Sequence, residues 1–250
     1  MERYRFLGIE IDAFTIETIN QKIDKIIKKE NKSLIANHNL HSIYLYHKDD
    51  NLKKFYQKTE YNHADGMSLV LLGKLFGYGL SRENRITYVD WIYPLMSLAE
   101  KENWKVMFIG SKPGVGEIAV EKIQDKFPNL KMQSHHGYFD RTTRSTENRD
   151  VLKRIEAFQP QILLVGMGMP IQEEWIYENY DDISANVILP CGACMDYIAE
   201  QVPTPPRWIG KIGLEWCYRL LSEPKRLWKR YLVEPWFVLW LIVRELFKKA

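Results

Sequence analysis

The segment Val106-Met-Phe-Ile-Gly-Ser-Lys-Pro-Gly-Val-Gly116 decides the fold class. A short apolar run leads into a glycine-rich turn, and the last residues of the segment begin a helical pattern. In a parallel α/β sheet this order brings a strand end, a tight turn and a helix N-terminus together. Backbone N–H groups and the helix dipole at such a turn favour phosphate, although glycine there also permits close packing of strand and helix.

Short apolar runs and helical patterns alternate on both sides of this segment. The apolar runs are at 33–36, 162–165 and 187–189, and the helical patterns are at 16–27, 118–127 and 151–158. The alternation predicts a Rossmann-like α/β domain, with a parallel sheet and helices on both faces. Ligands of such sheets bind beyond the carboxyl ends of the strands, so the residues directly after each run are the first candidates for chemistry.

The composition is that of a globular protein without a disulfide framework. The chain has 250 residues, of which 46% are hydrophobic and 27% charged, enough for one sizeable core with an appendage. Its first ten residues are mixed and polar, so we expect no secretory signal and a cytoplasmic protein. Cys191 and Cys194 form a single C-x-x-C pair after a late strand, with Cys217 apart from them. Burial of small side chains is a better interpretation of the pair than zinc or redox chemistry.

The composition changes near residues 201–207, where Pro203, Pro205 and Pro206 interrupt any helix. We therefore predict a Rossmann-like domain over 1–200 and a helical appendage over 201–250. The appendage has ten Lys or Arg against four Asp or Glu, a net charge of +6, and five tryptophans. Its apolar run at 236–243 is far too short to span a bilayer.

Tryptophan beside lysine and arginine is typical of a helix that lies in the headgroup region of a membrane. We therefore predict peripheral binding of the appendage to the inner face of the cytoplasmic membrane. Packing of the tryptophans on the core, or on a second subunit of a homo-oligomer, is the alternative.

Polar residues that follow predicted strands, and Asp65, which precedes an apolar helical pattern, carry a resemblance that covers nearly the whole chain. The polar residues are Asn37, Asn39, Asp65, Gln172 and Glu173. The segments that match are 37–39, 65–66, 85–90, 110–116, 166–173, 207–208, 213–216, 219–220, 223–224, 226 and 230–231. Together they resemble the WecG/TagA/CpsF glycosyltransferases, although Asn37 stands where threonine is common in that family and Tyr88 where glycine is usual.

The resemblance implies an inverting, UDP-sugar-dependent hexosyltransferase. Enzymes of this family have a Rossmann-like domain with a C-terminal appendage, and they make teichoic acid linkage units and other surface polysaccharides. The implied donor carries N-acetylmannosamine, its uronic acid or a related hexose, and the implied acceptor is a polyprenyl-diphosphate-linked sugar.

The resemblance also implies a role for each site residue. Asp65 is the expected general base, with Asn37 and Asn39 completing the catalytic set; an N-cap is the alternative for Asp65. The expected substrate-binding residues are Arg85, Asp90, Gly110, Ser111, Lys112, Gly114, Gly166, Gln172, Glu173, Arg207, Arg219, Arg226 and Arg230. The arginines are expected to meet diphosphate charge, although a surface salt bridge is the ordinary interpretation of Arg85.

The sequence favours transfer without a metal or cofactor. It contains no D-x-D motif, and the H-x-x-H pair His38 and His41 lacks a third metal ligand. The main alternative is a non-catalytic nucleotide-binding or scaffold protein of a membrane polysaccharide assembly. An NAD-dependent oxidoreductase is disfavoured because G-x-G-x-x-G is missing. Nucleic-acid binding is disfavoured because the aromatic residues of the tail cluster in one apolar run.

Overall fold

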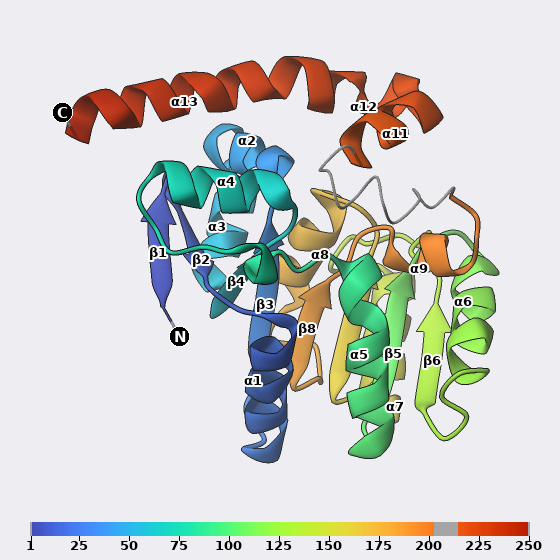
Figure 1. Cartoon of the computed structure of the whole chain (residues 1–250). Helices are drawn as coiled ribbons and strands as arrows, with labels where there is room; N and C mark the ends of the chain where they lie inside the picture. The colour runs from blue at the N-terminus through green and yellow to red at the C-terminus, as the bar shows by residue number, and fades with distance from the viewer. Residues whose placement is uncertain (1, 203–214, 250) are drawn as a thin grey trace.

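The computed structural model describes residues 2–202 and 215–249. Its centre is a sheet of six parallel strands in the order β4-β3-β8-β7-β5-β6 (Figure 1). The strands are β3 (Ser33–His38), β4 (Tyr61–Ala64), β5 (Lys105–Gly110), β6 (Lys131–His135), β7 (Ile162–Gly166) and β8 (Val187–Pro190). The predicted Rossmann-like α/β class is confirmed.

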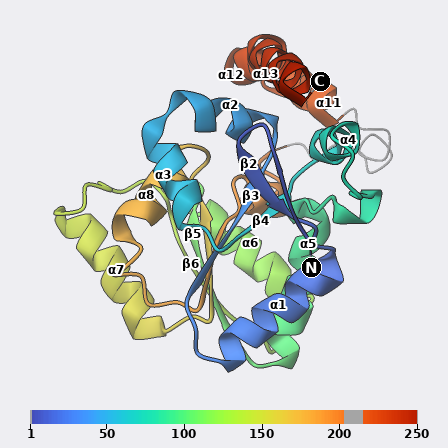
Figure 2. The ribbon, with the colours of Figure 1, turned by 90° about the vertical axis from the view of Figure 1, so that its left-hand side faces the viewer.

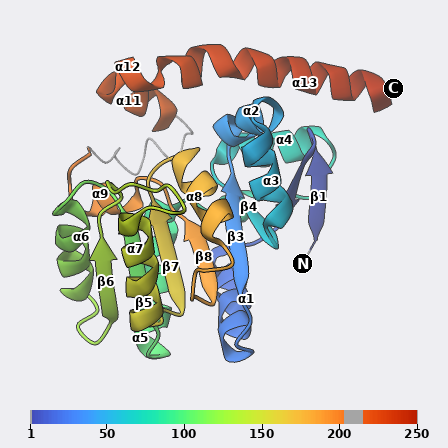
Figure 3. The same ribbon diagram turned by 180° about the vertical axis from the view of Figure 1, so that it is seen from behind.

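Helices cover both faces of this sheet, as the buried strands β7 and β8 require. The first face carries α1 (Ile16–Lys28), α5 (Tyr88–Lys101), α6 (Val115–Gln124) and α9 (Cys194–Ile198), the second α3 (Asp50–Lys58), α7 (Thr146–Phe158) and α8 (Ile171–Asn179). Figure 1 shows the first face and Figure 3 the second. Each face has its own apolar cluster, so the sheet is the middle of three layers.

Two of the predicted helices begin directly after residues that cap them. Thr15 caps α1 through a capping box with Thr18, and Ile19 and Ile23 bury the apolar face of the helix. Ser145 caps α7 by accepting a hydrogen bond from the N–H of Asn148. These two helices lie within a few residues of their predicted ranges.

A small antiparallel hairpin and three helical segments beside β4 were not foreseen in detail. They are β1 (Arg3–Phe6), β2 (Ile9–Asp12), α2 (Leu40–Lys48), α4 (Met67–Leu75) and the 3₁₀ turn η1 (Arg82–Asn84). The apolar helix expected after Asp65 is α4, but the hairpin has only two short strands and gave no clear periodicity. A third apolar cluster joins the hairpin, α2 and α4 to the C-terminal helix.

The C-terminal residues form a chain of helical segments that lies across the carboxyl end of the sheet (Figures 1 and 2). They are α11 (Glu215–Ser222), α12 (Pro224–Trp228), the π-helical turn η2 (Lys229–Val233) and α13 (Glu234–Lys249). Most of the predicted boundary, together with Trp208, falls in the gap at 203–214 and lies outside the described residues. The division at residue 200 therefore stays a prediction.

The last helix, α13, is attached to the core domain by apolar and polar contacts. Val238 and Leu241 are buried in the third apolar cluster. His41 Nδ1 lies 2.6 Å from Glu234 Oε2, and the N–H of Leu7 donates to Glu245 Oε2 at 2.7 Å. These two contacts tie α13 to α2 and to the hairpin.

The opposite face of α13 is also apolar, but nothing described in the chain covers it. Trp236 is 71% exposed and Trp240 52% exposed, and Leu239, Val243 and Phe247 on the same side are exposed as well. Packing on the core therefore accounts for one face of the helix and leaves its tryptophans in solvent. None of the helices in the described part of the chain is long and apolar enough to cross a membrane.

Candidate active site

Most of the described candidate residues lie at or just after the carboxyl ends of β3, β4, β5 and β7. The C-terminal segments overlie this edge of the sheet (Figure 1). Strands β5 and β7 are neighbours, yet β5 leads to α6 on one face and β7 to α8 on the other. Adjacent strands that lead to opposite faces open a crevice, which is where open α/β sheets bind ligands. The glycine turn and the segment 166–173 lie at this crevice.

Asp65 directly follows β4 and is half-buried. The side-chain N–H groups of Asn37 and Asn39 donate to Asp65 Oδ2, at 3.3 and 3.4 Å. The N-cap position of α4 is occupied by Gly66, without a side-chain cap, so Asp65 is not a helix cap. The carboxylate is therefore oriented by two amides, an arrangement suited to receiving a proton from a bound hydroxyl.

Each of the two asparagines makes a second hydrogen bond that holds it in place. Asn37 is the fifth residue of β3, opposite His63 of β4, and its carbonyl oxygen accepts from Tyr56 Oη at 2.9 Å. Asn39 caps α2 by accepting from the N–H of Ser42 at 3.0 Å, which leaves its side-chain N–H group for Asp65. Each asparagine therefore stabilises the fold and also contacts Asp65.

Arg85 and Asp90 lie together next to the end of β4. The N–H of Ile86 donates to the carbonyl of Ala64 at 2.9 Å, which brings the segment beside Asp65. Arg85 Nη1 lies 2.8 Å from Asp90 Oδ2, and Thr87 Oγ1 donates to the same oxygen at 2.9 Å. Arg85 is therefore in an ion pair beside Asp65, and its contact with diphosphate stays a prediction.

The glycine turn and the end of β7 are packed so closely that Gly110 and Gly166 cannot carry a side chain. A Cβ on Gly110 would lie 2.3 Å from the carbonyl oxygen of Gly166, and a Cβ on Gly166 would lie 2.6 Å from that of Gly192. The ends of β5, β7 and β8 therefore meet backbone to backbone. This contact forms the floor of the crevice.

Ser111 and Gly114 follow on this floor with left-handed backbones, at φ values of 56° and 84°. Ser111 Oγ is buried and has no hydrogen-bond partner among the described residues. Gly114 is the N-cap of α6 without a side-chain cap, and Lys112 beside it is exposed. The turn thus offers a hydroxyl, helix N–H groups and a cation, which suits an anion, and phosphate binding stays a prediction.

Gln172 is 2% exposed and uses both ends of its amide within the protein. Its Oε1 accepts from the N–H groups of Gly168 and Gly192, at 3.2 and 3.1 Å. Its Nε2 donates to Glu173 Oε1 at 2.8 Å. The structure therefore shows Gln172 bracing the loops after β7 and β8, while a sugar contact stays a prediction.

Glu173 is a buried carboxyl group with a raised pKa. Burial raises the pKa of Glu173 to about 7, against the opposing effects of the Gln172 hydrogen bond and of Arg230. Arg230 lies on η2 and is the described arginine of the tail block. Arg207 lies outside the described residues, and so do the side chains of Arg219 and Arg226.

Two buried tyrosines lie within the electric field of Asp65 and Glu173, and neither was among the predicted site residues. Tyr56 stacks on the His38 ring with 4.0 Å between centroids, and the hydroxyl of Tyr88 is buried without a partner among the residues described. Burial raises the pKa of both hydroxyls well above the ordinary value, and the negative charges of Asp65 and Glu173 add to the effect. The sequence marked Tyr88 only as a residue that stands where glycine is usual, and it gave no signal for Tyr56.

Cys191, Cys194 and His38 are buried. Cys191 and Cys194 are buried, and burial raises the pKa of the Cys194 thiol to about 12, so the interpretation of the pair as buried small residues is confirmed. His38 Nδ1 lies 3.0 Å from Ser42 Oγ, and burial lowers the pKa of its ring to about 3. Within 2–202 and 215–249 no group of three His, Cys, Asp or Glu could hold a metal ion.

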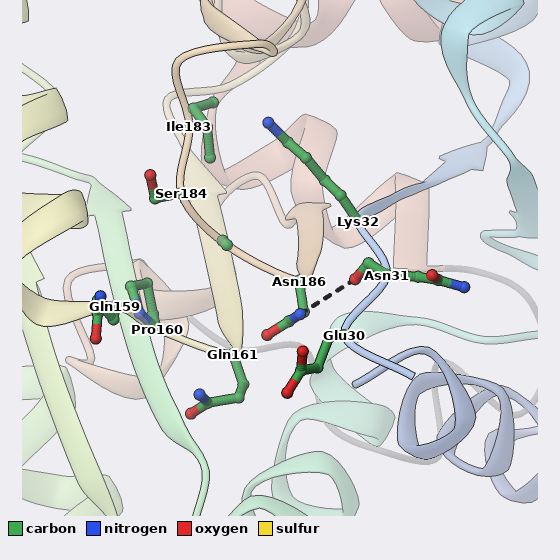
Figure 4. A pocket seen from close by; sticks show the side chains of 10 residues that line it. Glu30, Asn31, Lys32, Gln159, Pro160, Gln161, Ile183, Ser184 and Asn186 are labelled. Carbon is green, nitrogen blue, oxygen red and sulfur yellow. Dashed lines mark hydrogen bonds between the residues drawn. The ribbon is translucent and has the colours of Figure 1, made fainter. Parts of the chain in front are cut away.

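A shallow hollow lies at the opposite edge of the sheet and is distinct from this site. It is formed by the residues that precede β3, β7 and β8, and Asn186 Nδ2 donates to the carbonyl of Asn31 at 3.1 Å across it (Figure 4). Its position at the amino ends of the strands separates it from the candidate residues.

Comparison with known proteins agrees with this geometry. Residues 4–250 match the model of the "Glycosyl transferase WecG/TagA/CpsF family". Among curated proteins, the N-acetylglucosaminyldiphosphoundecaprenol N-acetyl-beta-D-mannosaminyltransferase of Staphylococcus aureus strain MRSA252 is 29% identical over 231 residues, 88% of this chain and 85% of that protein. The proteins of the same name from strains MW2 and NCTC 8325 / PS 47 are each 28% identical over the same shares. With a family match over nearly its whole length, the chain belongs to the WecG/TagA/CpsF family of glycosyltransferases.

Proposed function

We propose that the protein is an inverting hexosyltransferase that moves N-acetylmannosamine, its uronic acid or a related hexose from a UDP-sugar to a polyprenyl-diphosphate-linked sugar. The observation that carries the proposal is the half-buried Asp65 carboxylate, held by Asn37 and Asn39 at the carboxyl edge of the sheet. The names of the S. aureus relatives specify an undecaprenol-linked acceptor and a β-linked mannosaminyl product, which supports the same reaction class here.

The transfer is a single displacement. Asp65 takes the proton of the acceptor hydroxyl as its oxygen forms a bond to the anomeric carbon of the donor sugar. The bond from that carbon to the diphosphate oxygen breaks, and UDP leaves with the bonding electrons. Attack from the face opposite the leaving group inverts the anomeric configuration.

The leaving diphosphate needs compensation for the negative charge that it gains. Lys112, the N-terminal amides of α6 and Arg85 all stand at the carboxyl edge and can supply it. These groups are part of the chain, so the transfer needs no divalent cation.

Removal of divalent metal is therefore expected to leave the rate unchanged. The measurement is UDP release by the full chain in excess EDTA, compared with the same assay in Mg²⁺. A loss of activity in EDTA that added Mg²⁺ restores would show that a metal carries the diphosphate charge.

We also propose that the exposed apolar face of α13 binds the membrane that holds the acceptor. Trp236 and Trp240 project from this face, and the exposed cations Lys225, Lys229 and Arg244 lie on α12, η2 and α13. Aromatic rings prefer the interface, and cations are attracted to anionic lipid. The appendage then lies between the membrane and the carboxyl edge of the sheet.

The double substitution Trp236→Ala and Trp240→Ala is expected to weaken binding to anionic vesicles at least about tenfold, because each ring contributes on the order of 1.5–3 kcal/mol when it is buried. Cosedimentation with phosphatidylglycerol vesicles measures the binding. Tyr138→Ala is the matched control, since Tyr138 is an aromatic residue of the core domain that is 65% exposed. Equal binding by all three proteins would contradict membrane docking through α13.

The experiment that tests the proposed reaction is UDP release from a panel of UDP-sugars, with and without a polyprenyl-diphosphate-linked N-acetylglucosamine. Acceptor-dependent release is expected for an N-acetylmannosamine donor or a close relative. Tight binding of UDP-sugars without release from any of them would instead support the nucleotide-binding scaffold.

A further inference from the structure

Helix α2 lies between the candidate active site and the C-terminal helix α13. Its N-cap is Asn39, whose side-chain N–H group donates to Asp65. Along its side, α2 packs against α13, which lies directly above it in Figures 1 and 3. One short helix therefore contacts the proposed base at its N-terminal end and the C-terminal helix along its length.

His41, in the first turn of α2, makes a close polar contact with α13. Its ring Nδ1 lies 2.6 Å from Oε2 of Glu234, the first residue of α13. An ionised carboxylate only accepts hydrogen bonds, so the ring N–H group is the donor. The side chain of His41 is 15% exposed and that of Glu234 11% exposed, so water has little access to the contact. Loss of either partner would leave the other polar group nearly buried and unpaired.

The same turn of α2 sets the direction of the Asn39 amide. The N–H of Ser42 donates to Asn39 Oδ1 at 3.0 Å, and the N–H of Asn39 donates to Ser42 Oγ at 2.9 Å. This capping box directs Asn39 Nδ2 toward Asp65 Oδ2, at 3.4 Å. A distance of 3.4 Å is at the long end for a hydrogen bond, so a small displacement of the turn would break the contact with Asp65.

Other contacts between α2 and α13 lie further along α2. The ring of Tyr44 meets the ring of Phe237 edge to face, with 5.5 Å between centroids. Lys48 Nζ, on the last residue of α2, lies 4.5 Å from the centroid of the same Phe237 ring. These contacts hold α13 on α2 at a distance from Asn39, whereas the contact of His41 with Glu234 acts in the turn that carries the cap.

We propose that His41 is a positioning residue of the transfer reaction: its hydrogen bond to Glu234 holds the first turn of α2 against α13 and thereby keeps the Asn39 amide on Asp65. This inference rests on the proposed function, because it takes Asp65 as the base. His41 acts through Asn39 and not on the donor. Its loss therefore lowers kcat and leaves the KM for the UDP-sugar largely unchanged.

The first arm of the test is kcat of the full chain in the assay of acceptor-dependent UDP release. His41→Ala and Glu234→Ala are each expected to lower kcat by about twofold to about thirtyfold, the range for residues that act on a site through others. The double variant is expected to lose no more than either single variant, because both remove the same hydrogen bond. Losses that multiply, or a wild-type kcat in His41→Ala, would overturn the proposal.

Two matched variants separate this hydrogen bond from the general seating of α13. His41→Asn places an amide nitrogen as many bonds from Cα as Nδ1 is, so it is expected to recover most of kcat. Lys48→Ala removes a contact with Phe237 at the other end of α2 and is expected to leave kcat unchanged. A His41→Asn enzyme as slow as His41→Ala, or an equal loss in Lys48→Ala, would contradict a specific role of His41.

The second arm needs no catalysis and follows hydrogen exchange of the Ser42 N–H by NMR. This group donates to Asn39 Oδ1, so its protection reports whether the cap is closed. Exchange is expected to be about tenfold faster or more in His41→Ala and in Glu234→Ala, the equivalent of one lost hydrogen bond with a charged partner. The amides of β7 and the Lys48→Ala variant are expected to keep wild-type protection. Unchanged exchange of Ser42 in both variants would overturn the proposal.

The two arms distinguish failure of this inference from failure of the proposed function. If the wild-type protein transfers no sugar, the proposed function fails, and the positioning role of His41 fails with it. If the wild-type protein transfers sugar and Asp65→Ala does not, while His41→Ala keeps its kcat and its Ser42 protection, the reaction stands and the role of His41 alone is wrong.

Discussion

Replacement of Asp65 by alanine is expected to lower kcat by about 10² to 10⁴, the usual contribution of a positioned general base. The carboxylate is the group at the site that can remove the proton of the acceptor hydroxyl, and Asn37 and Asn39 already orient it. Donor binding involves other groups, so the KM for the UDP-sugar is expected to change little. Initial rates of UDP release at saturating donor and acceptor measure the effect.

Two further variants show whether the fall in kcat comes from the loss of the proton acceptor. Asp65→Asn keeps the shape of the side chain but cannot take the proton, and it is expected to be nearly as inactive as the alanine variant. Asp181 lies in a distant loop, and its side chain is 89% exposed. Asp181→Ala is therefore expected to leave kcat unchanged. An Asp65→Ala enzyme with near wild-type kcat and an unchanged Tm would remove Asp65 from the mechanism.

Gly110→Ala is expected to destabilise the protein by about 1–3 kcal/mol or more, through overpacking of the floor of the crevice. The new methyl group would lie 2.3 Å from the carbonyl oxygen of Gly166, and both atoms belong to strands buried on two faces. Neither backbone can move without disturbing the β5–β7 pairing. Thermal unfolding should show a Tm lower by roughly 2–4 °C for each kcal/mol lost.

The matched control is Gly114→Ala, four residues further along the same turn. A Cβ there meets no atom within 4 Å, although the φ of 84° strains any L-residue. Its expected cost is about 1 kcal/mol, the ordinary penalty for a side chain in the left-handed region. Equal stability of the two variants would mean that the strand ends are not packed as closely as described.

Continuous apolar runs predicted the central strands, because a strand buried on both faces needs apolar residues at every position. The edges of the sheet carried no such signal. β6 is an edge strand with the sequence Lys-Met-Gln-Ser-His, and β4 buries Asn62 and His63, which look like loop residues in a sequence. Both strands depend on their neighbours for structure.

The sequence suggested individual candidate residues, but it did not predict which of them contact one another. Asp65 was expected just before an apolar helix, yet its contacts with Asn37 and Asn39 follow from the parallel register of β3 and β4, which sequence does not determine. The internal hydrogen bonds of Gln172 depend on a loop twenty residues away. The raised pKa of Glu173 depends first on its burial, which the packing around α8 produces and the sequence does not show.

The most direct test of the central claim is isolation of the lipid product from the full chain incubated with UDP-N-acetylmannosamine and polyprenyl-diphosphate-linked N-acetylglucosamine. Mass spectrometry is expected to show an acceptor heavier by one N-acetylhexosamine residue, with equimolar UDP, and no such product from Asp65→Ala. UDP released without any lipid-linked disaccharide, or a product formed equally well by Asp65→Ala, would contradict the account.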